Sequence, residues 1–339
     1  MIRSQRGLPA GQAGSMLVMA LWALTLLVLF SLSLGFGVRQ KATLLSRLSA
    51  LDAVYPIAYS GVEEAKSLVK SDTDFDVDAM SDPWASGSKR RELGRGVFSL
   101  LTDGSLPVVD EERKVNLNST SNEIAERLFE RVTGLSKSDA DELVYNLLDW
   151  MDSDSFFGHP QYGAEASYYE NLSKPYTTKN APYEALDELL LVKGMTPEIF
   201  AKIRPYVTVY GNGRVNINTA SREVLAALGF SEAAVDAIAA YRAGKDFAEG
   251  TSDDPFFTNV NSIAADLQTK GKTPLDDSQT VLLSGLIAGD RLSVVSSAFS
   301  VTSRGELPDG AALEVDSVFD RKGVVLYQRT GEVRWPVRT

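Results

Sequence analysis

The chain has 339 residues, of which 44% are hydrophobic, so it is long enough and apolar enough to bury a core in each of two domains. Its 45 Asp and Glu outnumber 34 Lys and Arg, and the net charge of −11 disfavours a polyphosphate partner such as nucleic acid. Cysteine is absent and there is one histidine, which excludes thiol nucleophiles, disulfides and cysteine-based metal sites and disfavours a histidine triad.

The N-terminal region carries an uncharged apolar stretch from Ser15 to Val38. This stretch is long enough to cross a bilayer as one helix. Arg3 and Arg6 precede it without a nearby acid, so the positive-inside rule predicts that residues 1–14 stay in the cytoplasm and that the rest is exported. A secretory signal peptide and a plain anchor are the alternatives, although no clean A-x-A cleavage site follows the stretch.

The boundary between the basic leader and the apolar stretch is Gly14-Ser15, and it resembles a type IV prepilin signal. That resemblance implies cleavage by prepilin peptidase between Gly14 and Ser15, with the helix kept for anchoring and assembly. Gly7 is a competing cleavage site that would leave Pro9 and a polar spacer ahead of the helix. The fifth mature position is Met19, where most such proteins have Glu. This departure is typical of general secretion pathway protein K. The stretch GSMLVMALWAL of this chain resembles the N-terminus of that family.

Beyond the apolar stretch, the spacing of Leu44, Leu45, Leu48 and Leu51 predicts that the helix continues, now amphipathic, to about Lys70. Pro56 lacks a backbone donor and crowds the carbonyl four residues earlier, so it should bend the helix or open a gap in it.

The next segment, residues 71–96, is rich in Asp, Ser and Gly and is expected to be a solvated acidic loop. The spacing does not match an EF-hand, because the positions that need Gly and Glu, counted from Asp72, hold Val77 and Pro83. Whether the acids of this loop bind metal stays open. They are Asp72, Asp74, Asp76, Asp78 and Asp82.

Strand patterns occupy residues 97–117 and 291–335, and helical periodicity dominates between them. The predicted fold class is α+β, with a long N-terminal helix packed on a small antiparallel sheet and a large all-helical insertion, the organisation of the pseudopilin fold. The predicted segments are the leader 1–14, the helix 15–70, the acidic loop and first strands 71–117, the insertion 118–288 and the C-terminal strands 289–339.

The insertion contains an internal repeat, in which Lys114–Leu128 aligns with Arg214–Leu228. Each copy reads as a strand end, a cap, a helix, a Gly turn and a second helix. The second copy resembles the helix-hairpin-helix motif of competence DNA receptors. Its turn around Gly229 lacks the second Gly of that motif, and its three Arg are balanced by three acids, so a helical scaffold is favoured over a phosphate-binding surface.

A related stretch, Ala185–Pro205, again reads as helix, Gly turn and helix, with Thr196 capping the second helix ahead of Pro197.

Four carboxylates gather near the end of a predicted helix. Asp149, Asp152 and Asp154 are close in sequence, and Glu165 follows after a loop that can fold back. Dense hard oxygen ligands suggest calcium. An exposed acidic helix end is the alternative, although acids there oppose the helix dipole unless a cation is bound.

The same region, DWMDSD followed by GAEASYY and PYTTKNAP, closely resembles the most recognisable stretch of the secretion protein K family. The resemblance implies calcium bound by Asp149, Asp152, Asp154 and Glu165. Further matching residues are expected to pack and to form hydrogen bonds rather than to bind metal, namely Tyr168, Tyr169, Tyr176 and Asn180.

The resemblance covers nearly the whole chain and implies a minor pseudopilin of a type II secretion system at the pseudopilus tip. It further implies a single-pass inner-membrane location with the main domain in the periplasm. The partners expected are minor pseudopilins of the I and J type, prepilin peptidase, the secretion platform and the inner membrane, with no nucleic acid. No P-loop, H-E-x-x-H or G-x-S-x-G motif suggests an enzyme. A membrane-anchored helix-hairpin-helix DNA receptor and an anchored acid-dependent hydrolase are the alternatives.

Overall fold

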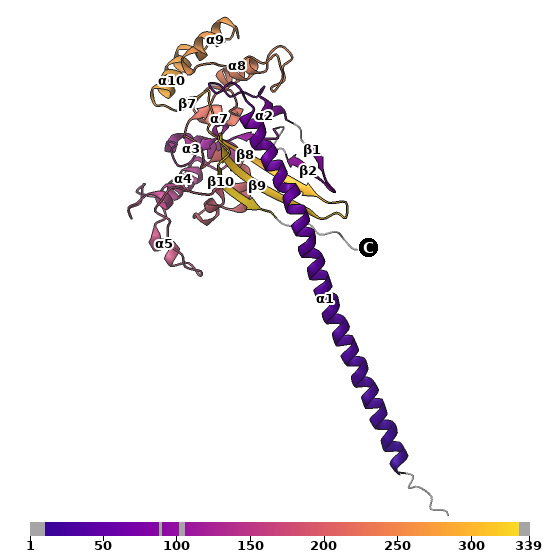
Figure 1. The fold of residues 1–339 in the computed structure, drawn as a ribbon. Coiled ribbons are helices and arrows are strands. Elements are labelled where there is room, and N and C mark those ends of the chain that lie inside the picture. Colours follow the sequence, from indigo (N-terminus) through magenta and orange to yellow (C-terminus); the bar gives the residue numbers. More distant parts are fainter. Residues whose placement is uncertain (1–10, 88–89, 102–105, 332–339) are drawn as a thin grey trace, which may run out of the picture.

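The computed structural model describes residues 11–87, 90–101 and 106–331, without the side chains of 11–15. A long helix, α1 (Gly11–Lys70), extends as a rod away from a head that holds the remaining elements (Figure 1). Most of the predicted leader, residues 1–10, lies outside the described residues. Gly14 and Ser15 belong to the start of α1, so the helix begins before the residue at which it was predicted to begin.

Helix α1 ends at Lys70 as predicted, and it carries two different surfaces. Its apolar part is exposed and is the one helix among the described residues that is long and apolar enough to cross a membrane, with a mean hydropathy of 2.4. Its last turns bury Val54, Ala58 and Val62 completely. Pro56 lies between these buried residues and does not interrupt the helix, because packing on both sides holds the chain in the helical course.

The sheet beside α1 has six strands, all antiparallel, in the order β1-β2-β8-β9-β10, with β3 also pairing with β8. This confirms the predicted α+β class. The strands are β1 (Arg90–Leu93), β2 (Gly96–Leu101), β3 (Val109–Asp110), β8 (Ala298–Glu306), β9 (Ala312–Asp320) and β10 (Val325–Thr330).

The acidic segment 71–96 was predicted to be a loop, and this prediction is only partly correct. It contains the short helix α2 (Pro83–Ser86), with Pro83 in its first turn, and strand β1. Strand β1 forms because a tight turn returns the chain antiparallel to β2, pairing Leu93 with Gly96.

The head has two apolar cores. One lies between α1, α2 and the sheet, where alternate strand residues such as Phe98, Phe299 and Val315 face α1. The close approach of α1 to β8 depends on Gly305, because a Cβ there would lie 2.6 Å from the backbone nitrogen of Ala58. The second, larger core fills the insertion. Each part of the head therefore has its own apolar core.

The insertion is mainly helical but not all-helical. It includes strands β5 and β6, whose parallel pairing with β4 and β7 ties the insertion to the flanking chain. The α-helices are α3 (Asn122–Thr133), α4 (Lys137–Met151), α5 (Ala166–Glu170), α6 (Pro197–Ile203), α7 (Arg222–Ala227), α8 (Glu232–Arg242), α9 (Ile263–Thr269) and α10 (Asp277–Ala288). The 3-10 helices are η1 (Glu111–Arg113), η2 (Leu186–Leu191) and η3 (Val260–Ser262). The short strands are β4 (Val115–Asn116), β5 (Val207–Thr208), β6 (Val215–Asn216) and β7 (Leu292–Ser293).

The two copies of the repeat fold alike and pack together. Each begins with a short strand, and α3 of the first copy packs against α7 of the second, where the Arg127 side chain donates a 2.8 Å hydrogen bond to the carbonyl of Ala227. In each copy the second Asn of V-N-x-N binds both backbone groups of one distant residue. Asn118 holds Tyr183, and Asn218 holds Phe257. The repeated motif therefore fixes long connections of the scaffold.

In the stretch Ala185–Pro205, Thr196 caps α6 by accepting a hydrogen bond from the Ile199 amide, as predicted. The first predicted helix of this stretch is η2, a 3-10 helix rather than an α-helix.

Candidate metal centre

Three of the four predicted carboxylates meet at the end of α4. Asp149 lies in the last turn of α4, Asp152 is its C-cap residue, and Glu165 is the N-cap residue of α5. One carboxylate oxygen of each lies within 4.8 Å of the others. The chain between α4 and α5 folds back, and this brings Glu165 to the two aspartates.

The fold of this connecting loop depends on Asp149. The two oxygens of its side chain accept hydrogen bonds from the backbone amides of Gly158, at 2.9 Å, and Ala164, at 3.0 Å. Between them Gly163 adopts a φ of +133°, and a Cβ at this position would lie 2.2 Å from the Asp149 carboxylate. The loop therefore requires glycine at position 163 to approach Asp149 so closely.

Two of the three carboxylates, those of Asp149 and Glu165, are buried, and several oxygens of the group lack hydrogen-bond partners. Glu165 is only 4% exposed, and neither of its carboxylate oxygens has a hydrogen-bond partner; Oδ1 of Asp152 also has none. Burial, together with the charges of Asp149, Asp152 and Asp154, raises the pKa of Glu165 to about 7. Buried oxygens without hydrogen-bond donors suit a hard cation such as calcium.

Asp154 does not join this group of three. It is exposed, and its side chain accepts a 2.8 Å hydrogen bond from the backbone amide of Phe156. Its charge still contributes to raising the pKa of Asp152, after the larger effect of burial. Spacing along the sequence did not reveal this, because the chain turns after Asp152.

An aromatic cluster lies beside the carboxylates. The ring of Trp150 lies 5.1 Å from that of Tyr169 and 6.1 Å from that of Tyr176. The hydroxyl of Tyr169 accepts a hydrogen bond from the amide of Lys193, and that of Tyr176 donates one to the carbonyl of Leu191. These contacts fit the predicted packing and hydrogen-bonding roles.

The two other matching residues, Tyr168 and Asn180, lie outside this aromatic cluster but also contact neighbouring groups. Tyr168 is exposed and Lys193 lies over its ring, while Asn180 takes a positive φ of 48° and donates its backbone amide to the carbonyl of Trp150.

A second acidic group was missed at the junction of the sheet and the insertion. Asp110, Glu111 and Glu112 are almost completely buried. Glu112 accepts hydrogen bonds from the amides of Asn212, Ser297 and Ala298, which belong to two segments far apart in the sequence. The run of acids just before the first V-N-x-N copy was the available signal. From the sequence alone, such a run indicates exposed side chains, because only the tertiary contacts bury it.

The second repeat copy does not present free basic side chains. Arg214 pairs with Asp290, Arg222 with Asp236 and Arg242 with Glu249. These pairs agree with the scaffold interpretation, and no observation on the described residues favours a DNA receptor.

Residues 101–212, which contain the carboxylate group, match the family model described as type II secretion system (T2SS), protein K. Among curated proteins, the type II secretion system protein K of Aeromonas hydrophila is 38% identical over 92 residues, which are 26% of this chain and 28% of that protein. A putative type II secretion system protein K of Escherichia coli K12 is 31% identical over 86 residues, 25% of each chain. The match thus spans about a quarter of each relative.

Among solved structures, a chain of the GspK-GspI-GspJ complex from the type 2 secretion system of enterotoxigenic Escherichia coli has the same fold. The TM-score is 0.65 with 22% identity, and the likeness covers 86% of this chain and 99% of that one.

Proposed function

We propose that this chain is a member of the type II secretion system protein K family and acts as a minor pseudopilin that supports pseudopilus assembly and protein export. The observation that carries the proposal is the family match over residues 101–212, since it includes Asp149, Asp152 and Glu165 together with the aromatic cluster. The likeness of fold extends beyond that region.

The exposed apolar part of α1 supports anchoring as a single-pass protein of the bacterial inner membrane. A helix with this composition has no protein partner in the head, so lipid or neighbouring pseudopilin helices would cover it. With Arg3 and Arg6 on the cytoplasmic side, the head lies in the periplasm, and prepilin peptidase would remove the leader after Gly14 on the cytoplasmic side of the membrane.

A position at the pseudopilus tip follows from the bulk of the insertion. It makes the head much wider than α1, and a subunit stacked above it would meet this obstruction (Figure 1). Met19 in place of Glu is consistent with this position, because a topmost subunit has no neighbour above it whose N-terminus needs a carboxylate.

The partners that we propose are minor pseudopilins of the I and J type and the inner-membrane secretion platform. The solved chain with this fold belongs to a GspK-GspI-GspJ complex, and the shared fold supports similar partners here.

We further propose that calcium binds Asp149, Asp152 and Glu165 and has a structural role, with Asp154 adding negative charge nearby. The ion would hold the end of α4, the loop after it and the start of α5 together, because these three segments supply the carboxylates. The role of the acids is then structural rather than catalytic.

The proposal is tested by deleting the gene in its host and measuring export of type II substrates. Loss of export, restored by this chain, and co-purification of the restored chain with the I and J pseudopilins are expected. Unchanged export after deletion would contradict the proposed function.

Processing is tested by mass spectrometry of the membrane-inserted chain. A Gly14→Val variant is expected to keep its leader, whereas Gly7→Val is expected to lose residues 1–14 as the unaltered chain does. Cleavage that depends on Gly7 would show the other site to be used.

A further inference from the structure

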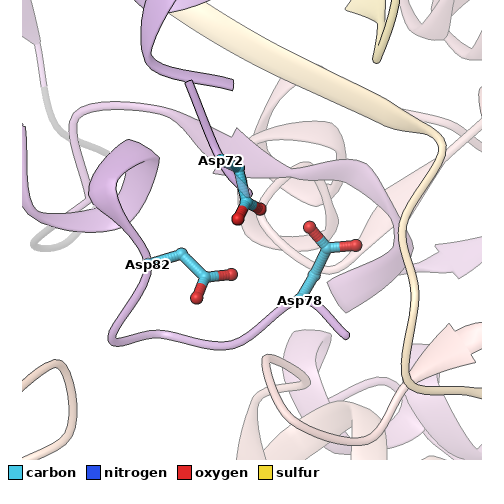
Figure 2. A group of neighbouring side chains, drawn as sticks. All are labelled: Asp72, Asp78 and Asp82. Atoms are coloured by element: carbon cyan, nitrogen blue, oxygen red, sulfur yellow. The ribbon is translucent and has the colours of Figure 1, made fainter. Parts of the chain in front are cut away.

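A third acidic group, with two of its three members buried, lies where α1 enters the head, outside the residues 101–212 that match the family model. Asp72 follows α1, Asp78 lies in the next turn and Asp82 precedes α2, and one oxygen of each lies within 4.8 Å of the others. Figure 2 shows the three carboxylates pointing toward a common space. Asp78 is completely buried and Asp72 is 5% exposed.

The chain around these acids is held in place by other hydrogen bonds. Asp78 accepts a 2.7 Å bond from the amide of Ser296, and Asp82 accepts bonds from the amide of Ala79 and the indole of Trp84. The Asp72 side chain accepts one from the amide of Asp74 through Oδ1. Oδ2 of Asp72 has no hydrogen-bond partner, although its residue is more than nine-tenths buried.

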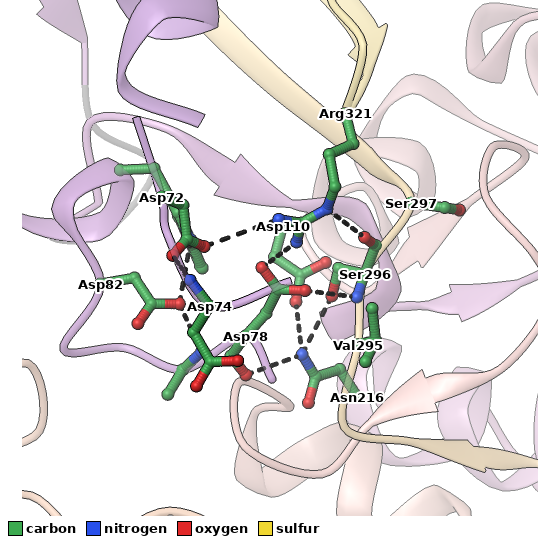
Figure 3. Close-up of polar contacts among 12 residues, drawn as sticks. Asp72, Asp74, Asp78, Asp82, Asp110, Asn216, Val295, Ser296, Ser297 and Arg321 are labelled. Carbon is green, nitrogen blue, oxygen red and sulfur yellow. Dashed lines mark hydrogen bonds and ion pairs between the residues drawn. The ribbon is translucent and has the colours of Figure 1, made fainter. Parts of the chain in front are cut away.

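One guanidinium partly neutralises the acids. Arg321, at the end of β9, binds Asp78 through Nη2 and donates to the carbonyl of Ser296 through Nε (Figure 3). Its Nη1 lies 3.6 Å from Oδ2 of Asp72, beyond hydrogen-bonding distance, and also lacks a partner. Three carboxylates against one guanidinium leave two negative charges, which is the charge that one divalent cation neutralises.

We propose that Asp72, Asp78 and Asp82 form a second divalent-cation site, of which calcium is the occupant. Carboxylate oxygens are the ligands that calcium takes, and its flexible coordination tolerates an irregular group more readily than the octahedral demand of magnesium does. The ion would fasten the end of α1 to the head, because Asp78 also bonds through its backbone amide to Val294 and through its carbonyl to Asn216. The site is independent of Asp149 and goes beyond the proposed function.

The experiment measures calcium binding to the full chain in detergent micelles by equilibrium dialysis with radioactive calcium. The starting variant carries Asp152→Asn and Glu165→Gln, so that the first site is removed. One calcium per chain is expected to remain bound. Adding Asp72→Asn or Asp82→Asn, each nearly the same in shape, is expected to weaken this binding at least tenfold.

The matched control is Asp76→Asn, an exposed acid in the same loop that is not one of the three, and it is expected to leave binding unchanged. A twofold excess of magnesium is expected not to displace the calcium. Circular dichroism without calcium shows whether each variant is folded. If the starting variant is unstable, Asp72→Asn in the otherwise unaltered chain gives the same test, because it is expected to lower the number of calcium ions bound per chain by one.

No calcium bound to the folded starting variant would overturn the proposal by showing that Arg321 alone neutralises the acids. Binding that survives both Asp72→Asn and Asp82→Asn would overturn it by showing that the remaining ion binds elsewhere. Because the two sites are altered separately, an unchanged number of bound calcium ions in the variant with Asp152→Asn and Glu165→Gln would instead count against the first site.

Discussion

At the residue scale, Glu165 shows how an ordinary surface-type side chain acquires a special role through burial. It stands at the N-cap of α5, where a carboxylate could accept the free amides of the helix start, yet its oxygens accept no such bond and lie with Asp149 and Asp152 instead. Without a cation, the three neighbouring carboxylates, two of them buried, repel one another, and this repulsion is the physical argument for calcium.

The first prediction concerns Glu165→Gln. Calcium at 100 times its dissociation constant is expected to stabilise the unaltered chain by about 2.7 kcal/mol, because the ion binds only the folded state. The variant loses a charged ligand, so most of this stabilisation should disappear. In calcium-free buffer at pH 8 the variant should unfold at a higher temperature than the unaltered chain, since one buried charge has gone.

Thermal unfolding with calcium and with chelator gives the measurement, and Glu170→Gln, at the exposed end of α5, is the control that should respond to calcium normally. An equal calcium-dependent shift in both variants would count against Glu165 as a ligand.

The second prediction concerns pH and Glu112. Burial, and then the charge of Asp110, raise the pKa of Glu112 to about 7. The folded state therefore holds a proton that the unfolded state has released between its ordinary pKa of about 4.5 and pH 7. Stability from this group is present below pH 4.5 and is lost as the pH rises to 7.

Glu112→Gln should flatten this fall in the free energy of unfolding, by on the order of 2 kcal/mol across the window. Urea unfolding at a series of pH values, with chelator present, measures it. Glu92→Gln, on the exposed strand β1, should leave the slope as it is. The idea fails if the slope of Glu112→Gln matches that of the unaltered chain.

At the element scale, the contact between α1 and β8 determines how the anchor joins the head. Gly305 of β8 faces the backbone of α1, where an added Cβ would lie 2.6 Å from the nitrogen of Ala58 and 2.9 Å from the carbonyl oxygen of Val54. Neither atom belongs to a flexible side chain, so the helix or the strand would have to move. Periodicity predicted both elements, but it contained no information on this distance.

The third prediction is that Gly305→Ala lowers the free energy of unfolding by about 1–3 kcal/mol, the usual cost of overpacking a core. Gly285→Ala is the matched control: nothing lies within 4 Å of its added Cβ in α10, so it should be neutral or stabilising. Chemical denaturation measures both. Equal effects of the two substitutions would show that α1 and β8 adapt without cost.

At the scale of the whole molecule, the two cores divide the head into parts with different dependence on α1. The core beside the sheet includes Ala58, Val62, Ala65 and Val69 from α1, all completely buried. The core of the insertion draws on no residue of α1.

The fourth prediction follows from truncation. A chain beginning at Ser46 removes the exposed apolar part of α1 and should be soluble and folded. A chain beginning at Ser71 also removes the buried turns, so the apolar face of the sheet is exposed and should cause aggregation. Size-exclusion chromatography and circular dichroism compare the two, and a monodisperse, folded chain from Ser71 would show that the sheet does not need α1.

By itself, the sequence determined the elements with strong local patterns: the apolar helix, its amphipathic extension to Lys70, the C-terminal strands and the two repeat copies. Such patterns arise from the spacing of apolar and polar residues along the chain, and this spacing is visible in the sequence itself. The tertiary structure alone decided which acids meet. It placed Glu165 beside Asp149, left Asp154 outside, and set Arg321 against Asp78, because contacts between distant residues depend on how loops return the chain and on which side chains the packing buries.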